Sequence, residues 1–475
     1  MTNAELRAAA VGTLAQRLSP KYLEEHCLVP VAVNEAGALV IAAGAQPDVT
    51  VLDELAWYYE RPVTVIAAPA AEIQAAVMSA QSEAASEVKA TDSLVVVSDE
   101  EEQIDDLRAL ANQAPVIKLV NLLILEALRA RASDIHLEAD SDGLQVRYRI
   151  DGVLQEISHP PRQYQAAVLS RVKIMAGLNI AERRLSQDGR IRLKLSDREL
   201  DLRVSITPTL HGEGVVLRIL DRGTGIRDLK DLGMPASVLE GFERLVRQPH
   251  GIVLVTGPTG SGKSTTLYGA LDRLNQASVK IITVEDPVEY QMKRVTQIAV
   301  NPKIGLTFAA VLRSILRHDP DIIMVGEMRD RETAEIAIQA ALTGHLVFSS
   351  LHTNDAPSAV TRMVDMGIEP YLVSATVLGV LAQRLVRVIC DACRGTGCEM
   401  CAQTGYRGRT GLYELMPLSE TLRERIVRQA PLAEIRAAAI AEGMVSLREA
   451  GLEKARAGVT TVEEVMRLTR DEVFG

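Results

Sequence analysis

Residues Gly257-Pro258-Thr259-Gly260-Ser261-Gly262-Lys263-Ser264-Thr265 decide the fold of this 475-residue chain. They follow an apolar, β-branched stretch at 252–256, and their last residues open a segment, 263–275, whose spacing predicts a helix. A strand, a glycine-rich turn and a helix in this order are the context that a P-loop requires. The glycines let main-chain N–H groups turn towards phosphate oxygens, and the helix N-terminus adds partial positive charge. The stretch therefore predicts a phosphate-binding site.

Two side chains of this turn have separate expected roles. Lys263 can reach the β- and γ-phosphates, and the Ser264 hydroxyl can ligate Mg²⁺. The sequence contains no Asn-Lys-x-Asp or Thr-Lys-x-Asp tetrapeptide of the kind that reads guanine, so ATP is the expected nucleotide. The predicted nucleotide-binding residues are Gly257, Pro258, Thr259, Gly260, Ser261, Gly262, Lys263, Ser264 and Thr265.

Further apolar strands alternate with helices along the same part of the chain. Residues 280–284, 322–325 and 346–349 are short buried-strand candidates separated by helical patterns. This alternation predicts an α/β fold with a mostly parallel sheet that helices cover on both faces. The carboxyl ends of such strands meet at one edge of the sheet, where the P-loop also lies.

Acidic residues and histidines stand at the ends of these strands. Glu327 follows 322–325, and we expect it to polarise the attacking water or to hold Mg²⁺ through water. Many P-loop enzymes carry an Asp just before this point, where Gly326 stands here, and a surface acid without a role is the alternative. Glu285 and Glu289 follow 280–284.

Two histidines bracket the strand candidate at 346–350. His345 precedes it and His352 follows it, each beside Thr or Asn. A histidine in the nucleotide crevice could sense the γ-phosphate or shuttle a proton, and we expect both residues to face it. A purely structural role for them is an equally open alternative.

Four of the five cysteines crowd into a short segment. They form two Cys-x-x-Cys pairs separated by four residues, Cys390 with Cys393 and Cys398 with Cys401. Four thiolates suffice for a closed, tetrahedral and therefore structural Zn²⁺ site. An iron–sulfur site and a redox pair are the alternatives.

Arginines are the remaining candidates for phosphate contacts. Arg313 and Arg317 are one helical turn apart, and Arg203 and Arg218 lie on predicted strands. A phosphoryl-transfer site commonly takes a cation from another domain or subunit. The alternative for each is an ordinary solvated surface arginine.

The chain divides by composition into a small mixed domain, an acidic linker, a second α/β domain and the P-loop domain. The linker holds nine acids and one lysine, and its apolar patch at 94–97 could dock elsewhere. Residues 220–234 look like a hinge. The predicted ranges are 1–80, 81–106, 107–230 and 231–475, the last containing the cysteine knuckle at 390–401 and C-terminal helices at 413–470.

Composition excludes some classes of protein. The net charge is −10 and aromatic residues are 3%, which argues against general phosphate-backbone binding and against base stacking on aromatic platforms. No apolar run reaches the roughly 18 residues of a membrane span, and the start lacks the order of a signal peptide. We therefore expect a cytoplasmic protein that does not bind nucleic acid directly.

The order of these motifs resembles the secretion ATPases of type II secretion systems and type IV pili. The P-loop and the blocks at 282–290, 312–330 and 343–356 are similar to the family's Walker A, Asp box, Walker B and His box. The paired Cys-x-x-Cys motif also matches. Upstream, 132–138, 146–154 and 200–220 resemble the family's second N-terminal domain, whereas the first domain resembles its N-terminal module only loosely.

This resemblance implies a RecA-like P-loop domain preceded by mixed α/β domains, with a zinc knuckle and a helical C-terminal region. It implies a hexameric motor that binds ATP, Mg²⁺ and Zn²⁺ and works at the cytoplasmic face of the inner membrane with a platform protein. It makes Glu327 the catalytic acid and Cys390, Cys393, Cys398 and Cys401 the zinc ligands. It also assigns Glu285 and Glu289 to the Asp box, His345 and His352 to the His box, and Arg203, Arg218, Arg313 and Arg317 to the arginines that reach the phosphates.

Within this family, the chain resembles an assembly or secretion motor. Retraction motors usually lack both the extra N-terminal module and the cysteines, which are present here. Some N-terminal modules bind cyclic di-GMP through an arginine- and leucine-rich repeat that 1–80 lacks, so type II secretion is expected, with pilus extension as the alternative. The chain departs from the family in its short cysteine loop and in Gly214, which stands where a basic residue is usual. More distant alternatives are a nucleic-acid translocase and an ATP-binding scaffold that does not hydrolyse.

Overall fold

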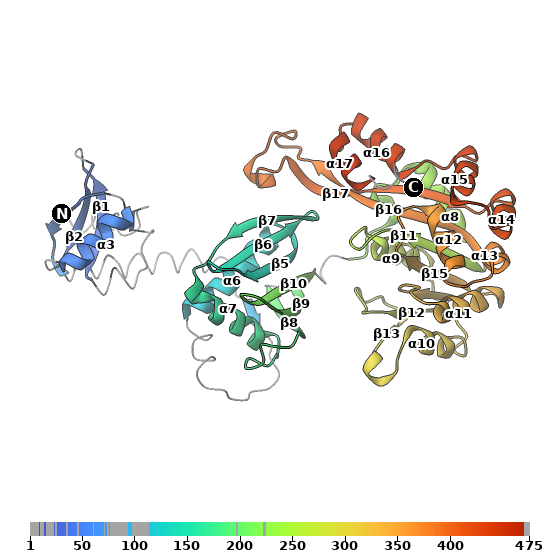
Figure 1. Ribbon diagram of the computed structural model, residues 1–475, viewed down its shortest axis with the longest axis horizontal. Coiled ribbons are helices and arrows are strands. Elements are labelled where there is room, and N and C mark those ends of the chain that lie inside the picture. Colours follow the sequence, from blue (N-terminus) through green and yellow to red (C-terminus); the bar gives the residue numbers. More distant parts are fainter. Residues whose placement is uncertain are drawn as a thin grey trace. The chain divides into compact units, whose positions relative to one another are not determined.

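The computed structural model divides the chain into two compact units, 1–95 and 96–475 (Figure 1). In the first unit it describes 26–34, 37–44, 47–59, 61–70 and the single residues 9, 14, 15, 23, 72, 73 and 76. It also describes the short strand β4 (Leu94–Val96) and then 114–195, 198–221 and 225–469.

The first unit contains a small sheet with one described helix. Strand β1 (Leu28–Val33) pairs antiparallel with β2 (Leu39–Ala43), which pairs parallel with β3 (Val63–Ala67). Helix α3 (Val49–Tyr59) contacts β3. The described residues of this unit therefore include both strands and a helix. The predicted acidic linker at 81–106 lies outside the described residues except for 94–96.

The second unit begins with an antiparallel sheet packed against two helices. Helices α6 and α7 contact each other and pack on β5, β6 and β8. The strands run in the order β8-β9-β10-β5-β6-β7, with each neighbouring pair antiparallel. The elements are α6 (Ala114–Arg129), β5 (Ala132–Ala139), β6 (Leu144–Ile150), β7 (Val153–Ser158), α7 (Arg162–Met175), β8 (Gln187–Leu195), β9 (Arg198–Thr209) and β10 (Gly212–Asp221).

Alternation of apolar residues explains this sheet. Leu144, Val146 and Tyr148 are buried at every second position of β6, as one face of a half-buried strand requires. Strands β6 and β7 form a tight hairpin, because Asp151 and Gly152 have φ of 49° and 87°, as a type I′ turn needs. Helix α7 and strand β8 were not predicted.

The P-loop part of the chain folds around a second sheet in the order β13-β12-β14-β15-β11-β16-β17. The pairs from β13 to β16 are parallel, and only β16 and β17 pair antiparallel. The strands are β11 (Gly251–Thr256), β12 (Ile281–Glu285), β13 (Val295–Ala299), β14 (Ile322–Val325), β15 (Leu346–Leu351), β16 (Val377–Ile389) and β17 (Tyr406–Pro417). The predicted mostly parallel sheet is therefore confirmed.

Alternate residues of β11 feed two separate cores. Ile252 and Leu254 pack with α10, α11 and α12, whereas Val253 and Val255 pack with α8 and α9 on the other face. All six residues of β11 are buried, as expected for a strand covered on both faces. The helices are α8 (Ala236–Val246), α9 (Lys263–Leu274), α10 (Phe308–Ile315), α11 (Arg331–Leu342), α12 (Ala356–Asp365) and α13 (Pro370–Thr376), with 3₁₀ turns η2 (Leu229–Leu232) and η3 (Pro302–Ile304).

Strands β16 and β17 form a long hairpin, and four helices follow it (Figure 1). The helices are α14 (Glu420–Val427), α15 (Leu432–Ala441), α16 (Leu447–Arg456) and α17 (Val462–Leu468). The prediction that helices begin at 413 is wrong, because 413–417 complete β17 and pair with β16. The cysteines and a 3₁₀ turn, η4 (Glu399–Cys401), lie at the tip of the hairpin. In the described part of the chain, no helix combines the length and the apolar character that crossing a membrane requires.

Candidate active site

The turn between β11 and α9 needs its glycines. Gly257, Gly260 and Gly262 have φ of 148°, 78° and 87°. A Cβ atom on Gly257 would stand 2.4 Å from the carbonyl oxygen of Gln383 on β16, which only glycine avoids. The side chain of Gln383 in turn accepts a hydrogen bond of 2.7 Å from Thr266 of α9. Strand β16 therefore braces the turn from the side.

Lys263 folds over its own loop. Its Nζ donates to the carbonyl oxygens of Gly257 at 2.8 Å and Pro258 at 3.0 Å. Burial lowers the pKa of Lys263 to about 8, against the opposing charge of Glu327. The ammonium is thus held at the mouth of the loop by two carbonyl groups that a phosphate oxygen can replace.

A cavity of about 750 Å³ opens above the P-loop. Residues 258–265 line it together with side chains from several strand ends. The predicted site residues beyond the loop that line it are Glu285, Glu289, Glu327, His352 and Arg218. The structure therefore brings the glycine turn, the predicted catalytic acid, both Asp-box carboxylates and one histidine to a single edge of the sheet, as the parallel topology requires.

Glu327 stands directly after β14 at the cavity wall, with 12% of its side chain exposed. Its carboxylate oxygens lie 2.5 Å from Nη2 of Arg329 and 3.1 Å from Nε2 of His352. The backbone explains Gly326 at the preceding position, because a Cβ there would approach the Val284 carbonyl oxygen to 3.3 Å. Glu327 is the acid of this strand end, and Arg329 and His352 orient its carboxylate.

Glu285 ends β12 and Glu289 follows it, but the two acids occupy different environments. Glu285 is 4% exposed and accepts hydrogen bonds from the hydroxyls of Tyr268 and Thr283 and from Gln297. Glu289 accepts a hydrogen bond from Ser264, and desolvation raises its pKa although Arg203 opposes that shift. The Ser264 hydroxyl and a nearby carboxylate are oxygen ligands of the kind that Mg²⁺ prefers, so this corner fits a magnesium ion.

The two histidines lie at opposite edges of the sheet. His352 follows β15 and lines the cavity, whereas His345 precedes β15, and its carbonyl accepts a hydrogen bond from Gly251 at the start of β11. The Nδ1 of His345 lies 2.8 Å from the carbonyl oxygen of Ala340. The expectation that both histidines face the crevice is wrong for His345 within one chain, because β15 runs parallel to β11 and its first residues lie at the far edge.

The predicted arginines also separate into two groups. Arg218 lines the cavity and its Nε donates to Asp134 at 2.9 Å, and Arg203 lies near enough to Glu289 for their charges to interact. Arg313 is exposed and its Nη2 lies 2.5 Å from Glu332, while Arg317 donates to the Arg313 carbonyl oxygen at 3.0 Å. Arg313 and Arg317 do not line the cavity of their own chain.

Arg384 is a cavity residue that sequence reasoning missed. It lies on β16, is 6% exposed, and its Nη2 donates to the main-chain and side-chain oxygens of Asn354 at 3.1 and 3.0 Å. A charged residue two positions after the apolar stretch at 377–382 of β16 was the available signal, because an arginine is rarely buried without a specific purpose.

The four cysteines converge at the tip of the β16–β17 hairpin. All four sulfur atoms lie within 4.8 Å of one another, with Sγ–Sγ distances of 3.9 Å from Cys390 to Cys398 and 3.7 Å from Cys393 to Cys401. A tetrahedral zinc with bonds of about 2.3 Å places its sulfur ligands about 3.8 Å apart, so the residues fit zinc. The short loop between the pairs does not prevent convergence.

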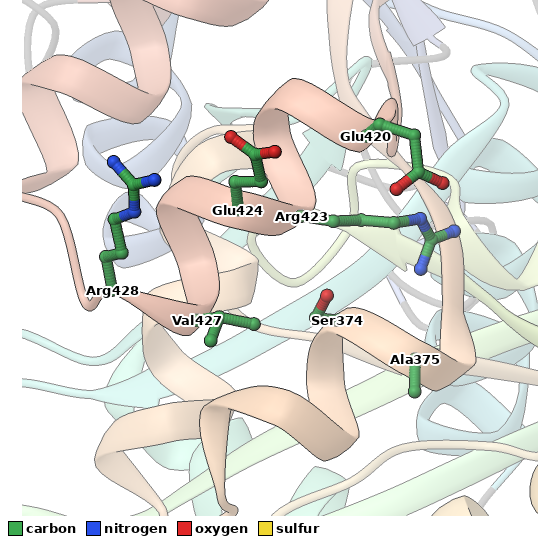
Figure 2. A pocket seen from close by; sticks show the side chains of 7 residues that line it. All are labelled: Ser374, Ala375, Glu420, Arg423, Glu424, Val427 and Arg428. Carbon is green, nitrogen blue, oxygen red and sulfur yellow. The ribbon is translucent and has the colours of Figure 1, made fainter.

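A second hollow, of about 620 Å³, lies between α13 and α14 (Figure 2). Figure 2 shows small side chains from α13 facing charged side chains from α14. Arg423 donates to the Val377 carbonyl oxygen at 3.1 Å, and burial lowers its pKa. The lining residues are Ser374, Ala375, Glu420, Arg423, Glu424, Val427 and Arg428. No glycine turn opens here, so the phosphate chemistry belongs to the first cavity.

Comparison with known proteins places this site in a family. The family model described as "Type II/IV secretion system protein" matches residues 109–467, and the model of the MshEN domain matches residues 4–87. The chain is 53% identical over 377 residues to the type II secretion system protein HxcR of Pseudomonas aeruginosa, covering 78% of this chain and 80% of the relative. It is 44% identical over 494 residues to the type IV pilus assembly ATPase PilB of Myxococcus xanthus, covering 96% and 87%.

Solved structures agree with this placement. The crystal structure of the pilus retraction motor PilT with bound ADP is 31% identical, covers 74% of this chain and 96% of its own, and superposes with a TM-score of 0.55. The ATPase DotB of Legionella pneumophila shares the fold at 22% identity, with a TM-score of 0.60 and coverage of 78% and 98%. With its P-loop edge and a family match over most of its length, the chain belongs to the type II/IV secretion system proteins and is a P-loop ATPase.

Proposed function

We propose that this ATPase is the motor of a type II secretion system, and that it works as a hexamer at the cytoplasmic face of the inner membrane to drive pseudopilus assembly and protein export. The observation that carries the proposal is its similarity to proteins named for type II secretion. Besides HxcR, the type II secretion system ATPase E of Vibrio cholerae is 48% identical over 410 residues, covering 80% of each chain. Platform and cytoplasmic-domain proteins of the same machine are the proposed partners.

Extension of a type IV pilus is the second candidate, and one observation favours it. The match to PilB covers 96% of this chain, whereas the matches to the type II relatives cover 78–80%. The difference in coverage corresponds in size to the first unit of this chain. The lack of the arginine- and leucine-rich repeat in 1–80 favours type II secretion instead.

Loss-of-function alleles in the native host separate the two candidates. We expect chromosomal Lys263→Ala to leave exported proteins in the periplasm while surface pili persist. Lys280→Ala, which removes an exposed lysine at the opposite edge of the sheet, serves as the matched control. Loss of pili with normal export would overturn the type II assignment and favour the pilus motor.

The geometry supports the following division of labour for hydrolysis. Main-chain N–H groups of 257–265 and the ammonium of Lys263 would hold the β- and γ-phosphates. Glu327 would orient a water molecule for attack on the γ-phosphorus and take up its proton as the bond to ADP breaks. Mg²⁺, when bound at Ser264, would neutralise charge on the β- and γ-oxygens.

Arg313 and Arg317 support the proposed assembly. They are exposed and outside the cavity of their own chain, so in a ring they would be available to a neighbouring site. Mixing Lys263→Ala subunits with Arg313→Ala subunits tests this. We expect the mixture to hydrolyse ATP faster than either variant alone, because some interfaces then combine an intact P-loop with an intact arginine. Activity equal to the average of the two variants would contradict shared sites.

The cysteine cluster is proposed to hold structural zinc. Cys390, Cys393, Cys398 and Cys401 would ligate it, and the metal would cross-link the tip of the β16–β17 hairpin. Metal analysis of the purified protein should give about one zinc per chain, and Cys398→Ser should abolish it. Cys27→Ser is the control that retains it. Iron with a visible absorption band in place of zinc would contradict the proposal.

A further inference from the structure

The short loop that joins β15 to α12, residues 352–355, connects the active site to the C-terminal helices. At its start, His352 lies 3.1 Å from the Glu327 carboxylate. The next residue, Thr353, donates its main-chain N–H to the Thr256 hydroxyl at 2.9 Å, and the two hydroxyls lie 2.7 Å apart. Thr256 is the last residue of β11, directly before the P-loop. The first residues of this loop therefore contact the ends of both β11 and β14.

The other end of the loop is tied to helix α15. Asp355 is 5% exposed, and one of its oxygens caps α12 by accepting from the Ser358 N–H at 2.7 Å. Its second oxygen accepts a hydrogen bond of 2.6 Å from Nη2 of Arg436. Arg436 lies 81 residues further along the chain, on α15, with 26% of its side chain exposed. The pair joins the loop that carries His352 to the C-terminal helices.

We propose that Arg436 is a positioning residue for hydrolysis. It fixes Asp355, and thereby sets where His352 stands against Glu327. Arg436 touches neither Glu327 nor the P-loop, so its effect passes through the loop. The inference rests on the proposed role of Glu327 and on the contact of His352 with its carboxylate.

The consequences of losing Arg436 follow from the contacts that remain. A buried carboxylate without its cation moves towards water, because an unpaired charge in the interior is costly. The loop would then shift at Asp355, three residues from His352. The start of α12 keeps a separate contact, because the main-chain N–H of Ala356 donates to Glu414 at 2.7 Å. The P-loop keeps its own contacts through Thr256. Loss of Arg436 should therefore lower kcat and leave the KM for ATP nearly unchanged.

Steady-state phosphate release by the full-length protein tests the proposal. We expect Arg436→Gln to lower kcat about tenfold with the KM for ATP within about twofold, and Arg436→Lys to recover most of the loss. Arg428→Gln, at the end of the neighbouring helix α14, is the matched control and should resemble wild type. Thermal unfolding shows whether each variant is folded. Should Arg436→Gln fail to fold, Asp355→Asn replaces it, because an amide oxygen still caps α12 while the charge is lost.

A double-mutant comparison distinguishes positioning from plain stabilisation. His352→Ala should cost about tenfold in the wild-type background but less than about twofold when Arg436 is already Gln, because the second change then removes an interaction already lost. An unchanged cost of His352→Ala in both backgrounds, or equal kcat for the Arg436 and Arg428 variants, would overturn the inference. Full hydrolysis by Glu327→Gln would instead overturn the proposed function, on which the inference rests.

Discussion

The carboxyl ends of β12 and β14 carry acids in two very different settings. The strands are neighbours, with Ile281 paired to Ile322, and each leads to a glutamate at the same edge of the sheet. Glu285 is 4% exposed, and its partners are the neutral groups of Tyr268, Thr283 and Gln297. Glu327 has Arg329 and His352 as partners, which are 66% and 47% exposed.

We propose that this difference separates a carboxylate that stabilises the fold from one that acts on a substrate. Both oxygens of Glu285 are occupied by buried donors, and displacing them would leave polar groups unsatisfied. The partners of Glu327 reach solvent, and the cavity lets water approach its carboxylate. We therefore propose that proximity to the P-loop is not sufficient for catalysis, and that solvent-exposed partners distinguish the acid that acts on water.

The largest expected effect is that of Glu327→Gln. Hydrolysis should fall by about 100-fold or more because the amide cannot accept a proton from water, while the free energy of unfolding changes by less than about 1 kcal/mol. Phosphate release and thermal unfolding of the same preparations measure both. Glu335→Gln, which removes an acid from an exposed pair with Arg331 on α11, is the control. Wild-type hydrolysis by Glu327→Gln would mean that the acids at the ends of β12 and β14 do not differ in catalytic role.

Much of this edge could be predicted because it is encoded locally. The glycine turn can be recognised from its residue types alone. Glu327 can be recognised because it follows an apolar strand. Topology then brings the ends of parallel strands together. The prediction for His345 was wrong for a local reason, since two histidines seven residues apart stand at opposite ends of one strand.

What could not be predicted depends on contacts between distant segments. The burial of Glu285 requires Gln297 from β13 and Tyr268 from α9, which no periodicity reveals. The pair of Asp355 with Arg436 joins residues 81 positions apart. The end of β17 could not be predicted either, because residues 413–417 belong to the strand through their pairing with β16 and not through a local pattern.

Glu285→Gln should be the next largest effect, and on stability rather than chemistry. An amide group would point an N–H at one of the three donors, two of which are buried, at a cost of about 2 kcal/mol in the free energy of unfolding. Chemical denaturation measures this, with Glu332→Gln on the surface of α11 as the control. We expect kcat of the folded protein to change less than about fivefold. A loss as large as that of Glu327→Gln, with stability unchanged, would make Glu285 a catalytic group.

Lys263 extends the comparison to pH, because its ammonium interacts with the charge of Glu327 at the end of β14. Burial lowers its pKa from 10.5 to about 8, so the free protein loses the ammonium above pH 8, whereas a bound triphosphate favours it. Affinity for a magnesium complex of a non-hydrolysable ATP analogue should fall up to about tenfold per pH unit above 8. Stability has the opposite sign: the native state binds fewer protons between pH 8 and 10.5, so this group's contribution rises with pH across that window.

Calorimetry from pH 7 to 9 tests the dependence of affinity on pH. Lys263→Arg should give a flat profile across this range, because a guanidinium keeps its charge there. Lys280→Ala is the control and should keep the wild-type slope. An equal slope in wild type and in Lys263→Arg would assign the titration to another group.

Arg329→Gln should have the smallest effect of these variants. It tests how much one exposed partner of Glu327 contributes to hydrolysis. Its Nη2 lies 2.5 Å from Glu327, and the hydrogen bond raises the pKa of the arginine, yet 66% of its side chain is exposed. Exposed ion pairs contribute about 1 kcal/mol or less, so kcat should fall no more than about fivefold and stability should hardly change. His352→Ala, which removes the other partner of Glu327, should cost more, because that side chain is fixed through the loop to the P-loop strand. If the Arg329 variant instead lost activity as Glu327→Gln does, the exposure of the partners could not be what distinguishes the end of β14 from that of β12.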